Sequence, residues 1–126
     1  MKQKIFSNNA PKPIGPYSQA IKANNIIFIS GQIGLDPKTN ILITDDIVKE
    51  TQMVMENIKN ILIKSNCRFE HIVKCSIFLS SMELFNTVNA VYGTYFKEPY
   101  PARETIEVSR LPKDANIEIS AIAICK

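Results

Sequence analysis

Arg103 and Glu118 are the two residues of this sequence whose types and positions are most indicative of chemistry. Both lie in PARETIEVSRLPKDANIEISAIAIC, which otherwise has the pattern of two apolar strands. Removing an unpaired ion from water costs several kcal/mol, so each charge faces solvent, pairs with the other, or binds a third group. Alternation places Thr105 on the strand face of Arg103, and Glu118 can face the same side if residues 108–116 connect two neighbouring strands. Two interpretations stay open: an exposed ion pair worth at most about 1 kcal/mol, or a polar patch that binds a ligand.

The elements that must position these residues are those of an α+β protein. Residues 2–6 suit a short first strand, and the proline-rich residues 10–18 predict a loop, because proline fixes φ and lacks a donor. The strand-like runs 19–23 and 26–32 flank Asn24 and Asn25, residues that tolerate the positive φ of a tight turn. These runs predict a β-hairpin.

From Thr44 to about Ser65 the apolar period becomes helical. Thr44 or Asp45 is expected to cap this helix, and its charged residues, including Glu50, fall outside the apolar face. The apolar face itself consists of Ile47, Thr51, Val54, Met55, Ile58, Ile61 and Leu62.

A buried strand is predicted over residues 71–80, followed by SSME, a capping-box signature in which Ser80 reaches forward and Glu83 reaches back. A second helix follows with an apolar stripe from Leu84 to Phe96. It ends before residues 98–101, where two prolines forbid continuation.

The predicted order is therefore βββαβαββ in a single domain of residues 1–126. Two helices packed about 10 Å apart cover one face of such a sheet but not both. Ile122 and Ile124 also give the last strand an apolar second face. We therefore expect a homo-oligomer that buries this face between subunits.

Composition narrows the classes of function. No segment of the 126 residues is long and apolar enough to cross a membrane. The net charge is only +3, and the lysines and arginines are scattered among 12 acidic residues, which does not indicate a nucleic-acid partner. The basic start lacks arginine and is followed by no apolar core, which favours a cytoplasmic location over organelle import.

The cysteines and the single histidine do not form a recognisable metal motif. Cys67, Cys75 and Cys125 are an odd set with spacings that match neither zinc nor redox motifs, and we expect free, buried thiols in a reducing compartment. His71 alone excludes multi-histidine metal sites and two-histidine nucleases, and we do not assign it a catalytic role.

Four separated motifs, PIGPYSQAI, ISGQIGLDPKT, FNTVNAVYGTYF and PARETIEVSRLPKDANIEISAIA, resemble those of the Rid/YjgF family over essentially the whole chain. The resemblance implies a chorismate-mutase-like fold, with a homotrimer whose sheets face inward and whose clefts lie between subunits. It also implies hydrolysis of 2-imino acids and their enamine tautomers, such as 2-iminobutanoate and 2-iminopropanoate, to 2-keto acids and ammonia.

The resemblance implies a role for each matching residue. Arg103 would bind the substrate carboxylate, Glu118 would orient water and accept its proton, and Thr105, where many relatives have cysteine, would supply a further polar contact. Tyr17 is grouped with the catalytic residues, and the other substrate-binding positions are Ser30, Gly31 and Asn89.

Neither a metal nor an organic cofactor is expected, because the sequence has no ligand cluster and no phosphate-binding glycine loop. Two other functions stay open. One is single-stranded RNA cleavage linked to inhibition of translation, against which His71 and the modest charge weigh. The other is a non-catalytic regulator that binds a small metabolite, which the presence of Arg103 disfavours.

Overall fold

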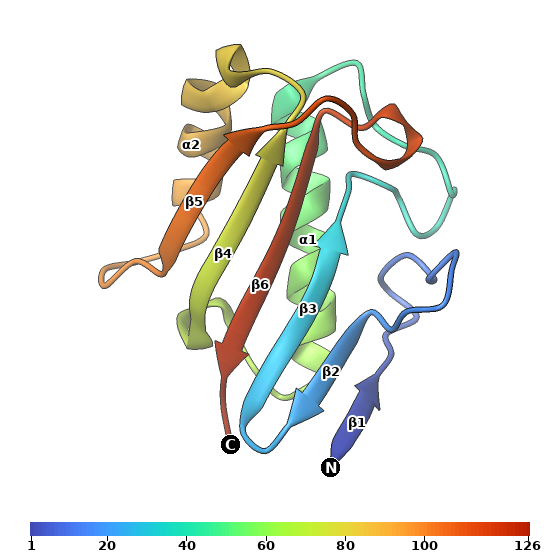
Figure 1. Ribbon diagram of the computed structural model, residues 1–126, viewed down its shortest axis with the longest axis vertical. Coiled ribbons are helices and arrows are strands. Elements are labelled where there is room, and N and C mark those ends of the chain that lie inside the picture. The colour runs from blue at the N-terminus through green and yellow to red at the C-terminus, as the bar shows by residue number, and fades with distance from the viewer.

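Six strands form one mixed sheet in this computed structural model, which describes residues 1–126 (Figure 1). The strands are β1 (Lys2–Ile5), β2 (Ala20–Ala23), β3 (Ile26–Gln32), β4 (Ile72–Leu79), β5 (Ala102–Glu107) and β6 (Ile117–Ile124). The helices are α1 (Ile47–Lys64) and α2 (Phe85–Gly93), with short 3₁₀ turns at Phe69–His71, Met82–Leu84 and Pro112–Asp114. The predicted order βββαβαββ is confirmed. Neither helix combines the length and apolar composition that a membrane span requires.

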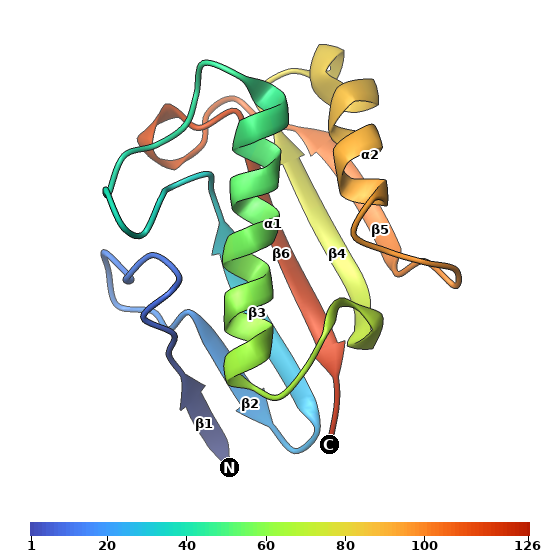
Figure 2. The ribbon, with the colours of Figure 1, turned by 180° about the vertical axis from the view of Figure 1, so that it is seen from behind.

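The strand order is β1-β2-β3-β6-β4-β5, and β4 and β5 are the one parallel pair. Both helices pack on the same face of the sheet, as the two opposite views show (Figures 1 and 2). The predicted layer arrangement is therefore confirmed. The last two strands in the sequence are not neighbours, however, because β4 lies between them.

The predicted hairpin is formed by β2 and β3, with Ala23 opposite Ile26. Asn24 adopts a positive φ of 55° in the turn, as its type allows. A further irregularity lies between Ile29 and Gln32, where the register of β3 against β6 shifts. This β-bulge adjusts the backbone around Gly31.

The first helix starts at Ile47 and is capped by Asp46, not by Thr44 or Asp45. One carboxylate oxygen of Asp46 accepts hydrogen bonds from the backbone N–H groups of Val48, at 2.9 Å, and Lys49, at 3.3 Å. These interactions satisfy donors of the first turn that have no partner within the helix. The predicted apolar face is otherwise correct, since its central residues Val54, Met55, Ile58, Ile61 and Leu62 are fully buried.

The predicted capping box of Ser80 and Glu83 does not form. Ser80 instead donates its hydroxyl to Oδ1 of Asn116 at 3.2 Å, and Ser81 accepts from the backbone N–H of Glu83 at 3.1 Å. The bond to Ser81 opens a 3₁₀ turn, so α2 begins only at Phe85. The serine one position later takes the capping role because Ser80 is held by the start of β6.

The free thiols expected of Cys67 and Cys125 are replaced by a disulfide, and Cys75 alone is free and buried. The two paired residues are 58 positions apart in the sequence, yet their Cα atoms lie 6.1 Å apart, within the range that a disulfide spans. The bond joins the segment after α1 to the end of β6.

The sheet has one buried and one open face. Ile27 and Ile29 of β3 are buried under the helices, whereas Phe28 between them points away from the helices. Phe28, Ile106 and Ile124 are exposed hydrophobic residues. An open apolar sheet face supports the expected burial of this surface between copies of the chain.

The homotrimer remains a prediction that the open face makes testable. The protein should sediment at about three times the chain mass of 14.2 kDa. Phe28→Lys should dissociate the assembly, because it places an ammonium in the buried interface, whereas Val48→Lys on α1 should leave the assembly intact. Phe28 and Val48 are matched in exposure, at 45% and 38%. A wild-type monomer at micromolar concentration, or equal effects of the two variants, would contradict the prediction.

Candidate functional site

Four of the predicted site residues lie together around a cavity of about 350 Å³ at the end of β3 and the start of β6. These residues are Tyr17, Ser30, Gly31 and Glu118, and we call them the glutamate half-site. Side chains from the proline-rich loop and from the 3₁₀ turn Pro112–Asp114 complete the cavity wall. The proline-rich loop thus brings Tyr17 to two neighbouring strands.

The side chain of Glu118 lies directly over the backbone of Gly31. A Cβ atom at position 31 would lie 2.7 Å from Cδ and 2.9 Å from Cγ of Glu118, and closer still to a carboxylate oxygen. Only glycine leaves room for this approach. Glu118 is half-buried, and burial raises the pKa of its carboxyl group above its ordinary range.

Ser30 and Tyr17 differ in how tightly the chain holds them. The hydroxyl of Ser30 donates to the backbone oxygen of Ser18 at 2.6 Å, so its proton is already engaged and the loop is tied to β3. Tyr17 is 51% exposed beside the cavity. Ser30 therefore acts mainly in holding the loop, and its oxygen remains an acceptor, whereas Tyr17 presents a phenol to solvent.

A second group, which we call the arginine half-site, consists of Arg103 and Thr105 on β5 and Asn89 on α2. The guanidinium of Arg103 lies 5.0 Å from the ring centre of Tyr92 and 5.8 Å from that of Phe85. Such stacking orients a cation without neutralising it. Arg103 takes part in none of the ion pairs of the chain.

Asn89 shares a face of α2 with the two aromatic rings, and Thr105 shares a face of β5 with Arg103. Asn89 is four residues after Phe85 and three before Tyr92, so all three share one face of α2. Thr105 follows Arg103 on the same face of β5, and its hydroxyl is buried without a hydrogen-bond partner. The half-site therefore contains a free cation and an unsatisfied hydroxyl.

The predicted single patch of Arg103, Thr105 and Glu118 is wrong within one chain. Arg103 is opposite Cys75 of β4, which is buried under the helices, whereas Glu118 is opposite Phe78, three residues further along β4. Odd separations along a strand point to opposite faces. The two half-sites therefore lie on opposite faces of the sheet with β4 between them, which also excludes the cross-strand ion pair between Arg103 and Glu118 in one subunit.

Glu50, which the helical pattern separates from the apolar face, is fully buried beside the start of β6. Its two carboxylate oxygens accept from the backbone N–H of Asn116 at 2.8 Å and from Nδ2 of Asn116 at 2.9 Å. Gly34 permits the contact, because a Cβ there would lie 2.8 Å from Cγ of Glu50. Glu50 thus holds the chain two residues before Glu118. The contact among Gly34, Glu50 and Asn116 could not be predicted from the sequence, because the three residues are far apart and form no local pattern.

One cluster has the residue types of a metal site. Ligand atoms of Cys67, His71 and Cys125 all lie within 4.8 Å of one another. The two sulfur atoms are joined in the disulfide, and Nδ1 of His71 accepts a hydrogen bond from the backbone N–H of Arg68 at 2.9 Å. The cluster lies at the end of the sheet opposite Glu118, since Ile72 pairs with Ala123 there.

Comparisons with known proteins give a consistent family. The family model described as Endoribonuclease L-PSP matches residues 7–125. RutC family protein PH0854 from Pyrococcus horikoshii is 54% identical over 123 residues, or 98% of each chain. The 2-iminobutanoate/2-iminopropanoate deaminase of Mus musculus is 42% identical over 120 residues, which cover 95% of this chain and 89% of that protein. The crystal structure of YyfA from Yersinia pestis, described as a protein of unknown function in the conserved Rid protein family, superposes with a TM-score of 0.96. It is 44% identical and covers 99% of this chain and 100% of the other.

The contact between Gly31 and Glu118 predicts that substitutions at the two positions are coupled. Gly31→Ala should lower the free energy of unfolding or displace Glu118, whereas in the Glu118→Ala background the added methyl group meets no carboxylate and should cost less. The coupling should be about 0.5–3 kcal/mol by denaturant unfolding. Gly93→Ala is the control, because a Cβ at position 93 meets open space. An equal cost of Gly31→Ala in both backgrounds would refute the contact.

The bonds of Glu50 predict a large stability difference between two positions of α1. Glu50→Ala removes the acceptor of two part-buried donors of Asn116, at a total cost of about 1–3 kcal/mol. Gln52→Ala, at an exposed position of the same helix, should change the free energy of unfolding by less than about 0.5 kcal/mol. Urea unfolding of both variants checks the difference. Similar values would show that Glu50 does not anchor β6.

Proposed function

The chain belongs to the Rid/YjgF family, and we propose that it hydrolyses 2-imino acids and their enamine tautomers to 2-keto acids and ammonia. The observation that carries this proposal is a pair of unpartnered charges. Arg103 forms no ion pair, and burial is the sole cause that shifts the pKa of Glu118. A planar cation and a desolvated carboxylate are the groups that this reaction requires at the two ends of a small zwitterionic substrate.

The first step of the proposal is recognition of the substrate carboxylate by Arg103. A guanidinium binds a carboxylate through two parallel N–H···O bonds, which fix its orientation as well as its position. The rings of Phe85 and Tyr92 hold the guanidinium plane, and Asn89 on the same face of α2 offers amide donors. Gly31 brings backbone close to the ligand from the opposite half-site.

The second step is addition of water to the C=N carbon. Glu118 accepts a proton from water as the oxygen attacks, and the C=N π electrons move to nitrogen, which gives a carbinolamine. Glu118 then returns the proton to the nitrogen, and the C–N bond breaks as ammonia leaves. The hydroxyl passes its own proton to the Glu118 carboxylate as the C=O bond forms, and Glu118 releases that proton to solvent, which restores the base. The products are a 2-keto acid and ammonia, so imine plus water balances. Tyr17 and Thr105 are polar groups available to hold the water.

These steps require two copies of the chain, because one copy presents its half-sites on opposite faces of the sheet. We propose that the arginine half-site of one subunit faces the glutamate half-site of the next in a homotrimer. The exposed residues Phe28, Ile106 and Ile124 on the open face provide apolar surface for this assembly. Each trimer would then contain three equivalent clefts.

The names of the relatives support the proposed reaction to different degrees. The mouse relative is named as a deaminase of 2-iminobutanoate and 2-iminopropanoate, whereas the more similar protein of P. horikoshii has only a family name. RNA cleavage has less support from the site, because His71 lies in the 3₁₀ turn at the other end of β4 from Glu118. A regulator that only binds a metabolite would show no turnover.

Two substitutions separate binding from proton transfer. Arg103→Ala should weaken binding of 2-oxobutanoate and abolish turnover of 2-iminobutanoate that a threonine dehydratase generates in the assay. Glu118→Gln keeps the shape and should retain most of the keto-acid affinity, while turnover falls about 10²- to 10⁴-fold. Arg68→Ala and Glu83→Gln, at exposed positions, are the matched controls. Two active but less stable proteins would refute both roles.

The raised pKa of Glu118 adds a pH signature to this experiment. Turnover should fall as pH drops through that pKa, with a midpoint above the ordinary range of glutamate. A raised pKa means that protonation of Glu118 stabilises the fold, and this contribution is lost as pH rises through the folded value. Glu118→Gln should therefore melt no lower than wild type at neutral pH. Its residual turnover should not show the fall at low pH that protonation of Glu118 causes in the wild type.

A further inference from the structure

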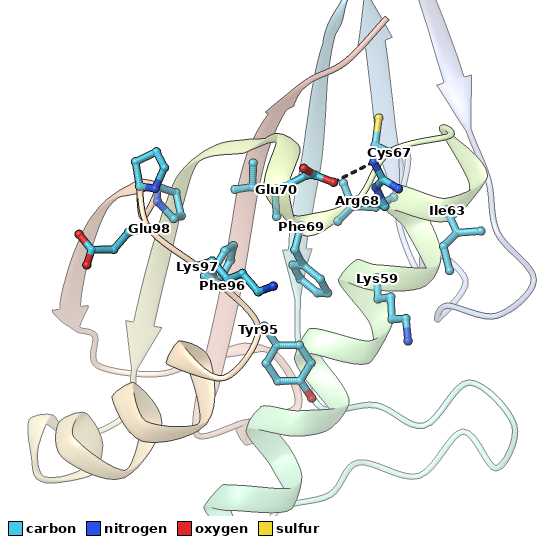
Figure 3. Close-up of a pocket in the computed structure, with 14 residues that line it drawn as sticks. Lys59, Ile63, Cys67, Arg68, Phe69, Glu70, Tyr95, Phe96, Lys97 and Glu98 are labelled. Atoms are coloured by element: carbon cyan, nitrogen blue, oxygen red, sulfur yellow. Dashed lines mark ion pairs between the residues drawn. The ribbon is translucent and has the colours of Figure 1, made fainter.

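A second cavity, of about 760 Å³, is lined by none of the residues of either half-site (Figure 3). It is enclosed by the last two turns of α1, the 3₁₀ turn Phe69–His71 and residues 95–101 after α2. Ile72, at the start of β4, lines it. Ile72 is opposite Ala123, whereas Glu118 is opposite Phe78, so about six residues of strand, or roughly 20 Å, separate the cavity from Glu118.

Aromatic rings form the apolar part of this cavity. The ring of Phe69 lies 5.3 Å from that of Tyr95 and 5.5 Å from that of Phe96, in tilted and edge-on arrangements. Figure 3 shows these three side chains side by side in the cavity. Tilted rings at this spacing offer faces and edges against which a further planar group packs favourably.

Some of the charged residues that line the cavity form ion pairs, and others do not. Arg68 is paired with Glu70 at 2.8 Å. Lys59 and Lys97 also line the cavity and take part in no ion pair. In Figure 3 the ammonium of Lys97 extends toward Phe69.

The carboxylate of Glu98, by contrast, points away from the cavity (Figure 3). Two lysines without ion-pair partners therefore line a cavity that has an aromatic surface. This combination suits an anion attached to a ring.

We propose that this cavity binds a small aromatic carboxylate at a site separate from the deaminase cleft. Its volume falls within the range of about 300–1,000 Å³ of small-molecule sites, which are apolar with a few placed polar groups. The ring of the ligand packs against the exposed faces and edges of Phe69 and Tyr95, and the ammonium groups of Lys59 and Lys97 bind its carboxylate at the mouth. Point-like ammonium groups suit a single carboxylate, which they contact without a fixed fork geometry.

Three related probes test whether binding requires both the aromatic ring and the carboxylate of the ligand. The probes are 3-phenylpropanoate, its neutral amide and propanoate, each titrated into the ¹⁵N-labelled assembled protein in the presence of saturating 2-oxobutanoate. We expect 3-phenylpropanoate alone to cause saturable chemical-shift changes in residues 59–72 and 95–101, at millimolar or lower concentration. Saturable binding in those residues despite 2-oxobutanoate separates this site from the deaminase cleft and does not depend on deaminase activity.

Variants test the assigned cations. Lys59→Met and Lys97→Met keep the length and apolar stem of the side chain, and each should weaken 3-phenylpropanoate binding about fivefold. Lys64→Met, at an exposed position of α1 that does not line the cavity, is the control and should bind as wild type. The proposal is overturned by no saturation with 3-phenylpropanoate, by equal binding of the amide, by shifts confined to the half-sites, or by lysine variants that bind as well as wild type.

Discussion

The pairing of β4 with β6 on one side and β5 on the other determines where each polar group of the candidate site lies. Arg103 is opposite Cys75 and Glu118 opposite Phe78, so their side chains leave the sheet on opposite faces. A shift of one residue in either register would move every side chain to the other face. Such a shift is opposed because alternate residues of β4, from Cys75 to Leu79, are buried beneath the helices.

The elements of this fold are predictable from the sequence, but the strand neighbours are only partly so. Hydrophobic period, turn residues and prolines identify the hairpin, both helices and the strands, because these signals are local. Placing residues 102–107 beside 117–124 was wrong, because a short connection favours adjacency without requiring it. The unit β4-α2-β5 did contain a usable signal, since a strand, helix and strand in succession usually form a parallel pair. Insertion of β6 between β3 and β4 depends on burial of Ile117 and Ile119, a tertiary effect.

Glu50 and the cysteines show why some contacts around the sheet could not be predicted from the sequence. A helical period separates charged from apolar positions, but it does not reveal that a distant asparagine supplies two donors to one carboxylate. Cys67 and Cys125 meet only because the end of β6 passes the segment that follows α1. In contrast, the family resemblance predicts Gly31 and Glu118 as site residues, and the close approach of the two gives a physical reason for glycine at position 31.

Separation of Arg103 and Glu118 within one chain has a consequence for the proposed reaction. If both side chains shared one face, they would neutralise each other, and a substrate would have to break their ion pair before binding. On opposite faces the guanidinium rests on aromatic rings, which hold it without quenching its charge, and the carboxylate remains desolvated with a raised pKa. A base with a raised pKa removes a proton from water more effectively than an ordinary carboxylate. In the proposed homotrimer, the two charges lie on either side of a cleft, where the substrate carboxylate is the natural partner of the guanidinium and leaves Glu118 free for water.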